Sequence, residues 1–425
     1  MPDARPVPRV RGGTGRSLSV ASELIQIASG RHFDSATVAR RCADELRGSS
    51  SDGSILLAFC GGKHDPNVVC DVLRRELGPV PIVGGSAAGL ITRAACSYSG
   101  FELAVAAFPP DLAPAVVVAD GLHNGEREAG RELGERIAGV VTDDAVVLVF
   151  YDSVAVGAPL QLHPASLLVE GLYAGLGDRR ISLIGGGLLT DMNLSDGWVF
   201  EGGTVRKHVA VALVFPPGIA VETTILHGCR PVSTFMEITR IDGAELYELD
   251  GRPALDVMEE MLGTDLGASS SQDLSLIATL GEKHGDPYAP YDENAYVNRL
   301  ILRANAATRT ITIFEPDFRA GTRVQIMSRD NGLMLESVRR GASMLHEAVA
   351  GRDVVLSLYV DCAGRASARS GAPVEEAEVL LENFRLDAPF LGFYSGVEIA
   401  PVNGYSRPLD WTAVLAVLYR TGGPT

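Results

Sequence analysis

The chain has 425 residues, of which 46% are hydrophobic and 21% charged, and it carries a formal net charge of −16. This length and composition predict two or three globular domains with a sizeable core. The negative charge argues against nucleic-acid binding, because phosphate backbones would be repelled. No apolar run in the sequence reaches the length of a membrane-spanning helix, so no membrane association is expected.

The N-terminal residues and the cysteines bear on location. Residues 1–18 are rich in Pro, Gly and Arg and are expected to form a disordered tail, not a secretory signal. The six cysteines include no CxxC pair, which argues against a zinc site or a disulfide framework. Scattered cysteines fit a reducing compartment, so a cytoplasmic location is expected.

A repeated order of elements runs along the chain. In its first occurrence the apolar run Ile55–Cys60 predicts a buried strand, and a polar loop follows it. Pro66 then opens a helix whose apolar residues recur on one face. After a second strand and a small-residue turn, a further strand, Leu103–Phe108, closes the unit. The same order begins again near Ala145 and Val354.

These units predict an α/β fold with mixed sheets. Strand, helix and strand form a crossover in which the two strands pair in parallel. The closing strand follows a shorter linker and is expected to pair antiparallel. Two domains are expected, 19–246 with the first two units and 247–425 with the third. The second domain also holds a β-rich insertion, with strands expected at Tyr296–Arg303, Thr308–Phe314 and Thr322–Met327.

Each polar loop lies at the C-terminal end of its first strand, where open α/β sheets bind ligands. It also precedes a helix N-terminus, which favours anions. The first two units place candidate ligand contacts there or in the following turn, namely Lys63, His64, Asp65, Ser86, Ser153 and His163. A solvated loop or a capping role is the simpler explanation for these side chains.

The third unit offers a sharper set. Arg365 suits recognition of a carboxylate or phosphate, and Cys362 beside an arginine could be an activated thiolate. No histidine base is near in sequence, so ligand binding and a structural role stay open ahead of catalysis. Tyr394 and Ser395 lie at the next strand end, and Glu398 could pair with Arg365. Related crevices in three units also suggest one composite site.

Several of these stretches resemble the FIST family. Pro81–Ile91 resembles the small-residue turn of FIST N-terminal domains, and Ile184–Gly187 resembles their second Gly-rich element. Asp361–Arg365 resembles the Cys-x-x-Arg element of the C-terminal domain, and Gly392–Ile399 is similar to its closing motif. The resemblance covers nearly the whole chain after the N-terminal tail.

The sequence departs from the family pattern at three places. Leu90 replaces a glutamate after the first small-residue turn, and Val397 replaces a glycine before the final glutamate. The usual His-Asn pair near the end is Leu409-Asp410. If the family's polar residues line a pocket, the pocket of this chain is altered, and its ligand can differ as well.

The resemblance implies an intracellular sensor that binds a small ligand, such as an amino acid or haem. No output module is recognised, so a separate signalling partner, for example a histidine kinase, is expected. The alternative is a haem-binding protein, either a nitric-oxide or gas sensor or a haem-dependent redox enzyme. His64, His163 and His284 are the candidate haem ligands. No catalytic set is recognised, and the oligomeric state does not follow from the sequence.

Overall fold

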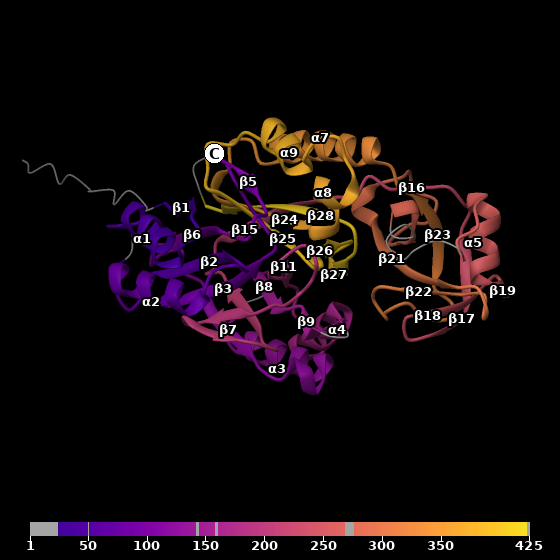
Figure 1. Ribbon diagram of the computed structural model, residues 1–425, viewed down its shortest axis with the longest axis horizontal. Helices are drawn as coiled ribbons and strands as arrows, with labels where there is room; N and C mark the ends of the chain where they lie inside the picture. The colour runs from indigo at the N-terminus through magenta and orange to yellow at the C-terminus, as the bar shows by residue number, and fades with distance from the viewer. Residues whose placement is uncertain (1–23, 50, 142–143, 158–159, 268–275, 423–425) are drawn as a thin grey trace, which may run out of the picture.

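The computed structural model describes residues 24–49, 51–141, 144–157, 160–267 and 276–422. The tail expected at 1–18 lies outside these residues. In Figure 1 three similar units make up the main body, and a β-rich region lies to one side of it. The predicted α/β class with mixed sheets is confirmed.

The first unit shows how the sequence pattern produces the repeat. Strand β2 is buried along its whole length and pairs in parallel with β3, as a strand–helix–strand crossover requires. Asp65 caps the connecting helix, because its carboxylate accepts the backbone N–H groups of Asn67 and Val68. The elements are β1 (Gln26–Arg31), α1 (Ser35–Glu45), β2 (Ile55–Gly61), α2 (Pro66–Leu77), β3 (Ile82–Ala87) and β6 (Glu102–Phe108).

The other two units repeat this order, and in each the closing strand is antiparallel to the first crossover strand. The second consists of β7 (Ala115–Ala119), α3 (Glu126–Ala138), β8 (Val146–Asp152), α4 (Ala165–Leu176), β11 (Ser182–Leu188) and β14 (Ala210–Val214). The third consists of β15 (Ile219–Leu226), α7 (Asn331–Ala348), β24 (Asp353–Cys362), α9 (Glu376–Asn383), β25 (Phe390–Ser395) and β28 (Ala413–Arg420).

The units are joined by an exchange of hairpins, which runs in a cycle. The hairpin that follows β3 completes the sheet of the third unit, the one after β11 completes the first, and the one after β25 completes the second. The exchanged strands are β4 (Leu90–Thr92) with β5 (Cys96–Ser97), β12 (Val199–Glu201) with β13 (Thr204–Arg206), and β26 (Glu398–Val402) with β27 (Tyr405–Leu409). Each sheet therefore depends on a segment from another unit.

The inner faces of the three sheets share one apolar core, and a pair of helices covers each outer face. Three phenylalanine rings meet in this core: the Phe59 ring centre lies 4.4 Å from that of Phe393 and 5.3 Å from that of Phe150. Phe59 and Phe150 lie on the first crossover strand, each opposite a glycine. In the third unit the ring comes instead from Phe393 on β25, opposite Val360.

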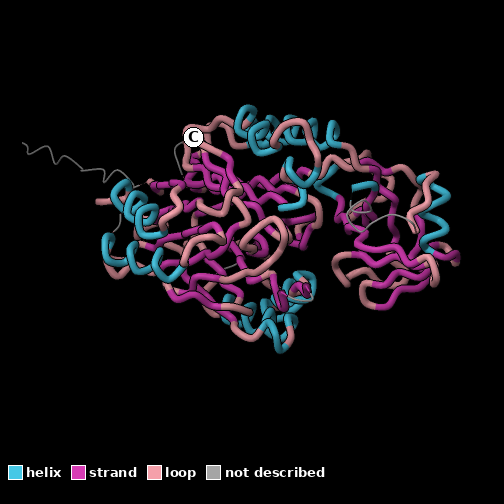
Figure 2. The backbone as a smooth tube through the Cα atoms, in the orientation of Figure 1, coloured by secondary structure: helices cyan, strands magenta, loops and turns pink. Residues whose placement is uncertain are grey.

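The β-rich insertion between β15 and α7 is a closed barrel. Because β23 pairs with both β17 and β20, the order β23-β17-β18-β22-β21-β20 returns to its start. Its elements are β16 (Arg230–Pro231), β17 (Met236–Asp242), β18 (Glu245–Leu249), β19 (Arg252–Pro253), α5 (Ala254–Leu262), β20 (Ala278–Lys283), β21 (Tyr296–Asn305), β22 (Thr310–Ile313) and β23 (Arg323–Ser328). Figure 2 shows this barrel beside the main body.

The remaining short elements lie in connections: η1 (Leu122–Asn124), β9 (Val154–Gly157), β10 (Leu160–Leu162), η2 (Glu293–Ala295), η3 (Ala363–Arg365) and α8 (Ser367–Ser370). Among the helices of the described residues, none combines the length and the apolar character that crossing a bilayer would need.

Candidate functional site

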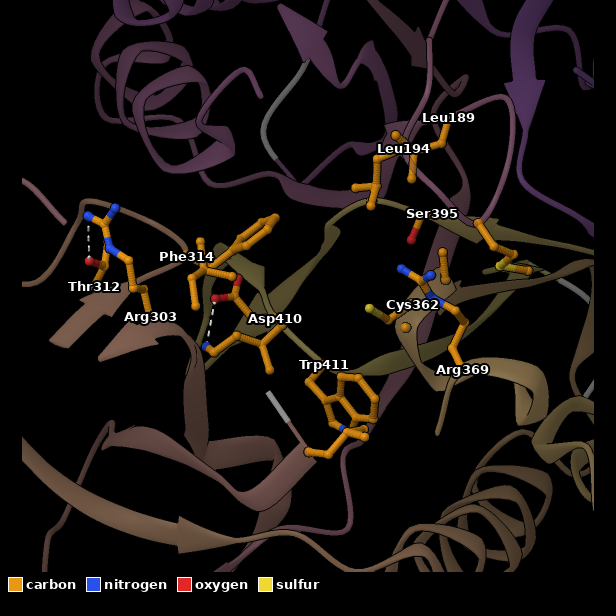
Figure 3. A pocket seen from close by; sticks show the side chains of 17 residues that line it. Leu189, Leu194, Arg303, Thr312, Phe314, Cys362, Arg369, Ser395, Asp410 and Trp411 are labelled. Carbon is orange, nitrogen blue, oxygen red and sulfur yellow. Dashed lines mark hydrogen bonds between the residues drawn. The ribbon is translucent and has the colours of Figure 1, made fainter. Parts of the chain in front are cut away.

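A pocket of about 560 Å³ lies between the third unit and the barrel. That volume is within the range of small-molecule sites, roughly 300–1,000 Å³. Its floor consists of the ends of β24 and β25 and the residues before β28 (Figure 3). The loop after β11 and the barrel strands β21 and β22 complete it. The pocket thus occupies the crevice at the C-terminal strand ends, where the sequence placed a ligand site in the third unit.

Most of the pocket wall is apolar, and it comes from three separate parts of the chain. The large apolar residues that line it are Leu189, Met192, Leu194, Leu276, Leu300, Leu302, Phe314 and Trp411. The polar residues are Arg303, Thr312, Cys362, Arg369, Ser395 and Asp410. An apolar wall with a few polar groups is the usual composition of a small-ligand site.

Trp411 holds an unusual conformation at the pocket floor. Its φ is 53°, in the left-handed region that large side chains rarely adopt. One neighbour is the guanidinium of Arg329, whose carbon lies 3.2 Å from the ring centre. On another side lies Gly364, where an added Cβ would be 2.8 Å from the indole ring. Such strain persists only where the surroundings hold it, and it is frequent at ligand sites.

Cys362 lines the pocket, but its thiol is not activated. The side chain is buried, and burial raises the pKa of the Cys362 thiol well above its ordinary value. The suggestion that an adjacent arginine makes it a thiolate is therefore wrong. Cys362 contributes a neutral thiol to the pocket surface.

Arg365 is fully buried and lies behind the pocket. Its Nε donates to Glu376 Oε2 at 2.9 Å, its Nη2 pairs with Glu376 Oε1, and its Nη1 donates to the backbone carbonyls of His227 and Trp411. Burial opposes its charge, yet the Glu376 carboxylate holds the pKa of Arg365 above its usual value. Arg365 therefore anchors the residues just before β28 from the protein interior.

Glu398 does not pair with Arg365, which corrects the expectation from the sequence. Its carboxyl accepts the Ser395 hydroxyl at 2.6 Å and the Thr412 backbone N–H at 3.3 Å. Ser395 ends β25 and Thr412 lies just before β28, whereas Arg365 is paired with Glu376 at the start of α9. Burial raises the pKa of Glu398 well above its ordinary value, which favours the protonated form of the carboxyl.

Among the described residues that line the pocket, Asp410 alone has a carboxyl group. It accepts the Leu300 backbone N–H at 3.1 Å, and its Oδ1 lies 3.5 Å from Nη1 of Arg299. Burial raises the pKa of Asp410 to about 8, although the Arg299 charge opposes this. Asp410 is therefore mostly neutral at pH 7.

This pKa predicts how stability changes with pH. Between pH 4 and 8 the folded Asp410 holds a proton that the unfolded chain has released, so stability falls as pH rises through this window. Replacing Asp410 by Asn should make that fall shallower, by up to about 1.4 kcal/mol per pH unit. Urea unfolding of both proteins across the window measures the two slopes. Equal slopes would contradict the prediction.

The first crevice uses its predicted residues within the fold. Lys63 Nζ lies 4.8 Å from the centre of the Phe101 ring, and His64 Nδ1 lies 3.1 Å from the Ser35 hydroxyl. Asp65 is the helix cap described above. Ser86 exchanges hydrogen bonds with the backbone of Trp198 on the incoming hairpin. None of the predicted residues in this crevice lines the pocket.

The second crevice is occupied by a hydrogen-bonded chain of side chains. His163 Nδ1 lies 2.8 Å from Glu126, and its Nε2 lies 3.0 Å from Nδ1 of His208. Ser153 is buried, with its hydroxyl close to the backbone of Gly396. In the third unit Tyr394 points away from the pocket and donates to Glu375 at 2.7 Å.

Of the predicted site residues, the pocket brings together Cys362 and Ser395. Sequence reasoning did not place Trp411, Arg369 or the barrel strands in the site. One signal was available: Asp410 stands where the family pattern has a different residue, and it lines the pocket. Nothing in the sequence marked the barrel leucines as pocket residues, because an apolar residue in a strand is expected to belong to the hydrophobic core.

The candidate haem ligands lie away from the pocket. His64, His163 and His284 do not line the pocket, and His284 Nε2 lies 3.2 Å from Glu282 in the barrel region. The described residues that line this pocket include no histidine, so they do not fit haem held by a histidine.

Two family domains match consecutive parts of this sequence. The FIST N domain matches residues 54–252, and the FIST C domain matches residues 254–401. The chain belongs to the FIST family. FIST domains are sensor domains of signal transduction. The boundary between the two matches falls at the start of α5, inside the barrel.

Mycobacterial relatives share part of the FIST sequence. The uncharacterized proteins Rv0628c of Mycobacterium tuberculosis and Mb0898c of Mycobacterium bovis are each 27% identical, over 256 and 262 residues. The alignments cover 60% of this chain and 64% of each relative, so the chain spans less than two thirds of their length.

Two solved structures of cyanuric acid hydrolase, one of them from A. caulinodans, are also similar. They have TM-scores of 0.35 and 0.31 and sequence identities of 9% and 10%. The alignments cover 94% and 93% of this FIST chain and 99% of each hydrolase chain. At these scores the likeness carries no argument about activity.

Proposed function

We propose that this FIST protein is a cytoplasmic sensor that binds a small, largely apolar ligand in the pocket beside Trp411. A separate partner, for example a histidine kinase, would receive the signal. The observation that carries the proposal is the composition of the pocket wall, which comes partly from the third unit and partly from the barrel. A ligand there contacts both parts at once.

Such a ligand can report its presence through the barrel. Glu315, which follows β22, accepts the backbone N–H groups of Ala165 and Ser166 at 3.1 and 2.9 Å. A barrel carboxyl thus caps helix α4 of the main body, close to the anion-favouring helix end. A ligand that draws the barrel strands toward Trp411 would shift Glu315 and so lengthen or shorten these two hydrogen bonds. The barrel is therefore the element whose position would depend on occupancy.

An enzyme on the same scaffold is the weaker alternative. Ser395 contacts the Glu398 carboxyl, which is a geometry that a nucleophile and a base would share. Burial raises the pKa of Glu398 well above its ordinary value, which disfavours the carboxylate form that a general base requires. The neutral thiol of Cys362 is a poor nucleophile for the same reason. These groups therefore favour ligand binding over catalysis as the function of the pocket.

A thermal-shift screen of small metabolites tests the proposal with a matched pair of variants. Leu302→Trp replaces an aliphatic side chain of the pocket wall by a bulky indole ring, whereas Val232→Trp changes an exposed barrel residue outside the pocket. A true ligand at about a hundred times its Kd should stabilise the wild type and Val232→Trp by about 2.7 kcal/mol. It should have little effect on Leu302→Trp. An equal response in all three proteins would exclude this pocket as the binding site.

A further inference from the structure

We propose that the ligand is an apolar carboxylic acid, whose carboxylate binds the guanidinium of Arg369 while its hydrocarbon part lies against Trp411 and the pocket leucines. This inference rests on the proposed binding function and narrows it to one chemical class. The inference concerns the charge of the ligand. That charge is inferred from the polar residues around the pocket.

Arg369 differs from the other arginines near the site. Arg365 has the Glu376 carboxylate as a partner, and Arg299 pairs with Asp317. Arg303, which also lines the pocket, lies 4.0 Å from the Glu245 carboxylate. Within the described part of the chain, no Asp or Glu forms a salt bridge with Arg369. Its Nη1 donates to the neutral side-chain amide of Asn193, with 3.4 Å to Oδ1.

The position of Arg369 allows it to meet a ligand. It is half-buried on the short helix α8 and lines the pocket, and Figure 3 shows its guanidinium directed toward the side where Ser395 lies. A guanidinium presents a planar fork of N–H donors that matches a carboxylate in two parallel hydrogen bonds. A ligand carboxylate would supply the anionic partner that the protein itself does not.

The rest of the pocket selects an apolar body. Eight large apolar residues line it, and one of them is Trp411, whose indole ring packs against Gly364 and the Arg329 guanidinium. Burying hydrocarbon against such a wall is favourable by roughly 25 cal/mol per Å² of apolar surface. A small polar anion such as phosphate would leave this wall without a partner.

An amino acid fits less well, because its ammonium group needs an anion. Asp410 has the one carboxyl group among the lining residues that the structure describes, and its oxygens already face the Leu300 N–H and Arg299. It is also mostly protonated at pH 7, since burial raises its pKa to about 8. A zwitterion would therefore bury its positive charge without compensation.

Three probes of the same chain length separate these ligand classes: octanoate, octanamide and α-aminooctanoate. Calorimetric titration of the full chain at pH 7 should show octanoate binding at least about tenfold more tightly than either of the others, as a charge-assisted hydrogen bond implies. Arg369→Gln should bind octanoate only as tightly as it binds octanamide. The affinity for octanamide should be the same in this variant as in the wild type. Arg369→Lys should retain part of the difference. Arg385→Gln, on an exposed arginine outside the pocket, is the control.

The outcomes distinguish this inference from the proposed function. Octanoate and octanamide could bind equally well, with no effect of Arg369→Gln and with binding lost in Leu302→Trp. That result would contradict the inferred carboxylate and still support binding in the apolar pocket. Tightest binding of α-aminooctanoate would overturn it in favour of amino acids. If none of the three probes binds the wild type, the carboxylic-acid inference fails. The metabolite screen with the pocket variants then decides the proposed function by itself.

Discussion

Replacing Arg365 by Met should lower the free energy of unfolding by about 3–5 kcal/mol at pH 7. The arginine is fully buried, and its removal leaves the Glu376 and Asp361 carboxyls without their cation. It also frees the carbonyls of His227 and Trp411, which it joins. Urea unfolding measures the change. The loss should shrink toward pH 5, because protonating a buried carboxyl then costs less.

Two further variants make this result interpretable. The double variant Arg365→Met with Glu376→Leu replaces the whole pair by apolar side chains and should recover most of the stability, since isolated charges are what destabilise. Arg252→Met breaks an exposed pair with Glu260 and should change stability far less than Arg365→Met, because water screens the two charges. A loss for Arg365→Met as small as that for Arg252→Met would show that the cluster is hydrated.

Phe393→Gly should also lower the free energy of unfolding by about 3–5 kcal/mol, because it removes a ring from the three-phenylalanine cluster and leaves a cavity. The glycine adds about 0.5–1 kcal/mol of backbone entropy within β25. Thermal and urea unfolding should agree on the direction. Mutating the exposed Phe33 to Gly is the matched control, because it removes the same side chain from a solvated site.

The repeat offers a rescue for this variant. In the first two units the phenylalanine lies on the first crossover strand opposite a glycine. Val360→Phe combined with Phe393→Gly recreates that arrangement in the third unit, where the two positions are neighbours across β24 and β25. The double variant should regain at least half of the lost stability. If it is less stable than Phe393→Gly alone, the third sheet does not share the packing geometry of the other two.

The repeated units were predictable because their signals are local. A buried strand such as Ile55–Cys60 and a helix that begins at Pro66 depend on residue types within a few positions of one another. The parallel pairing of β24 with β25 follows from the crossover, and the antiparallel β28 from its shorter link. The structure confirms these pairings in all three units.

The site was predictable only in part. The strand-end rule led to Cys362 and Ser395, because position along a strand fixes which end of the sheet a residue occupies. It could not tell that Arg365 turns inward to Glu376, since that depends on where α9 begins. Nor could it give the pKa of Cys362, which is set by burial among residues distant in sequence.

The sequence by itself therefore determined the α/β class, the three units and the crevice in which to look, because periodicity and turn residues act over short stretches of chain. Only the tertiary structure decided the cyclic exchange of hairpins, the closure of the barrel and the meeting of Arg369, Asp410 and Trp411 around one pocket. Those features depend on pairing and packing between segments far apart along the chain. A linear pattern does not encode which distant partners meet, since many pairings bury similar apolar surface.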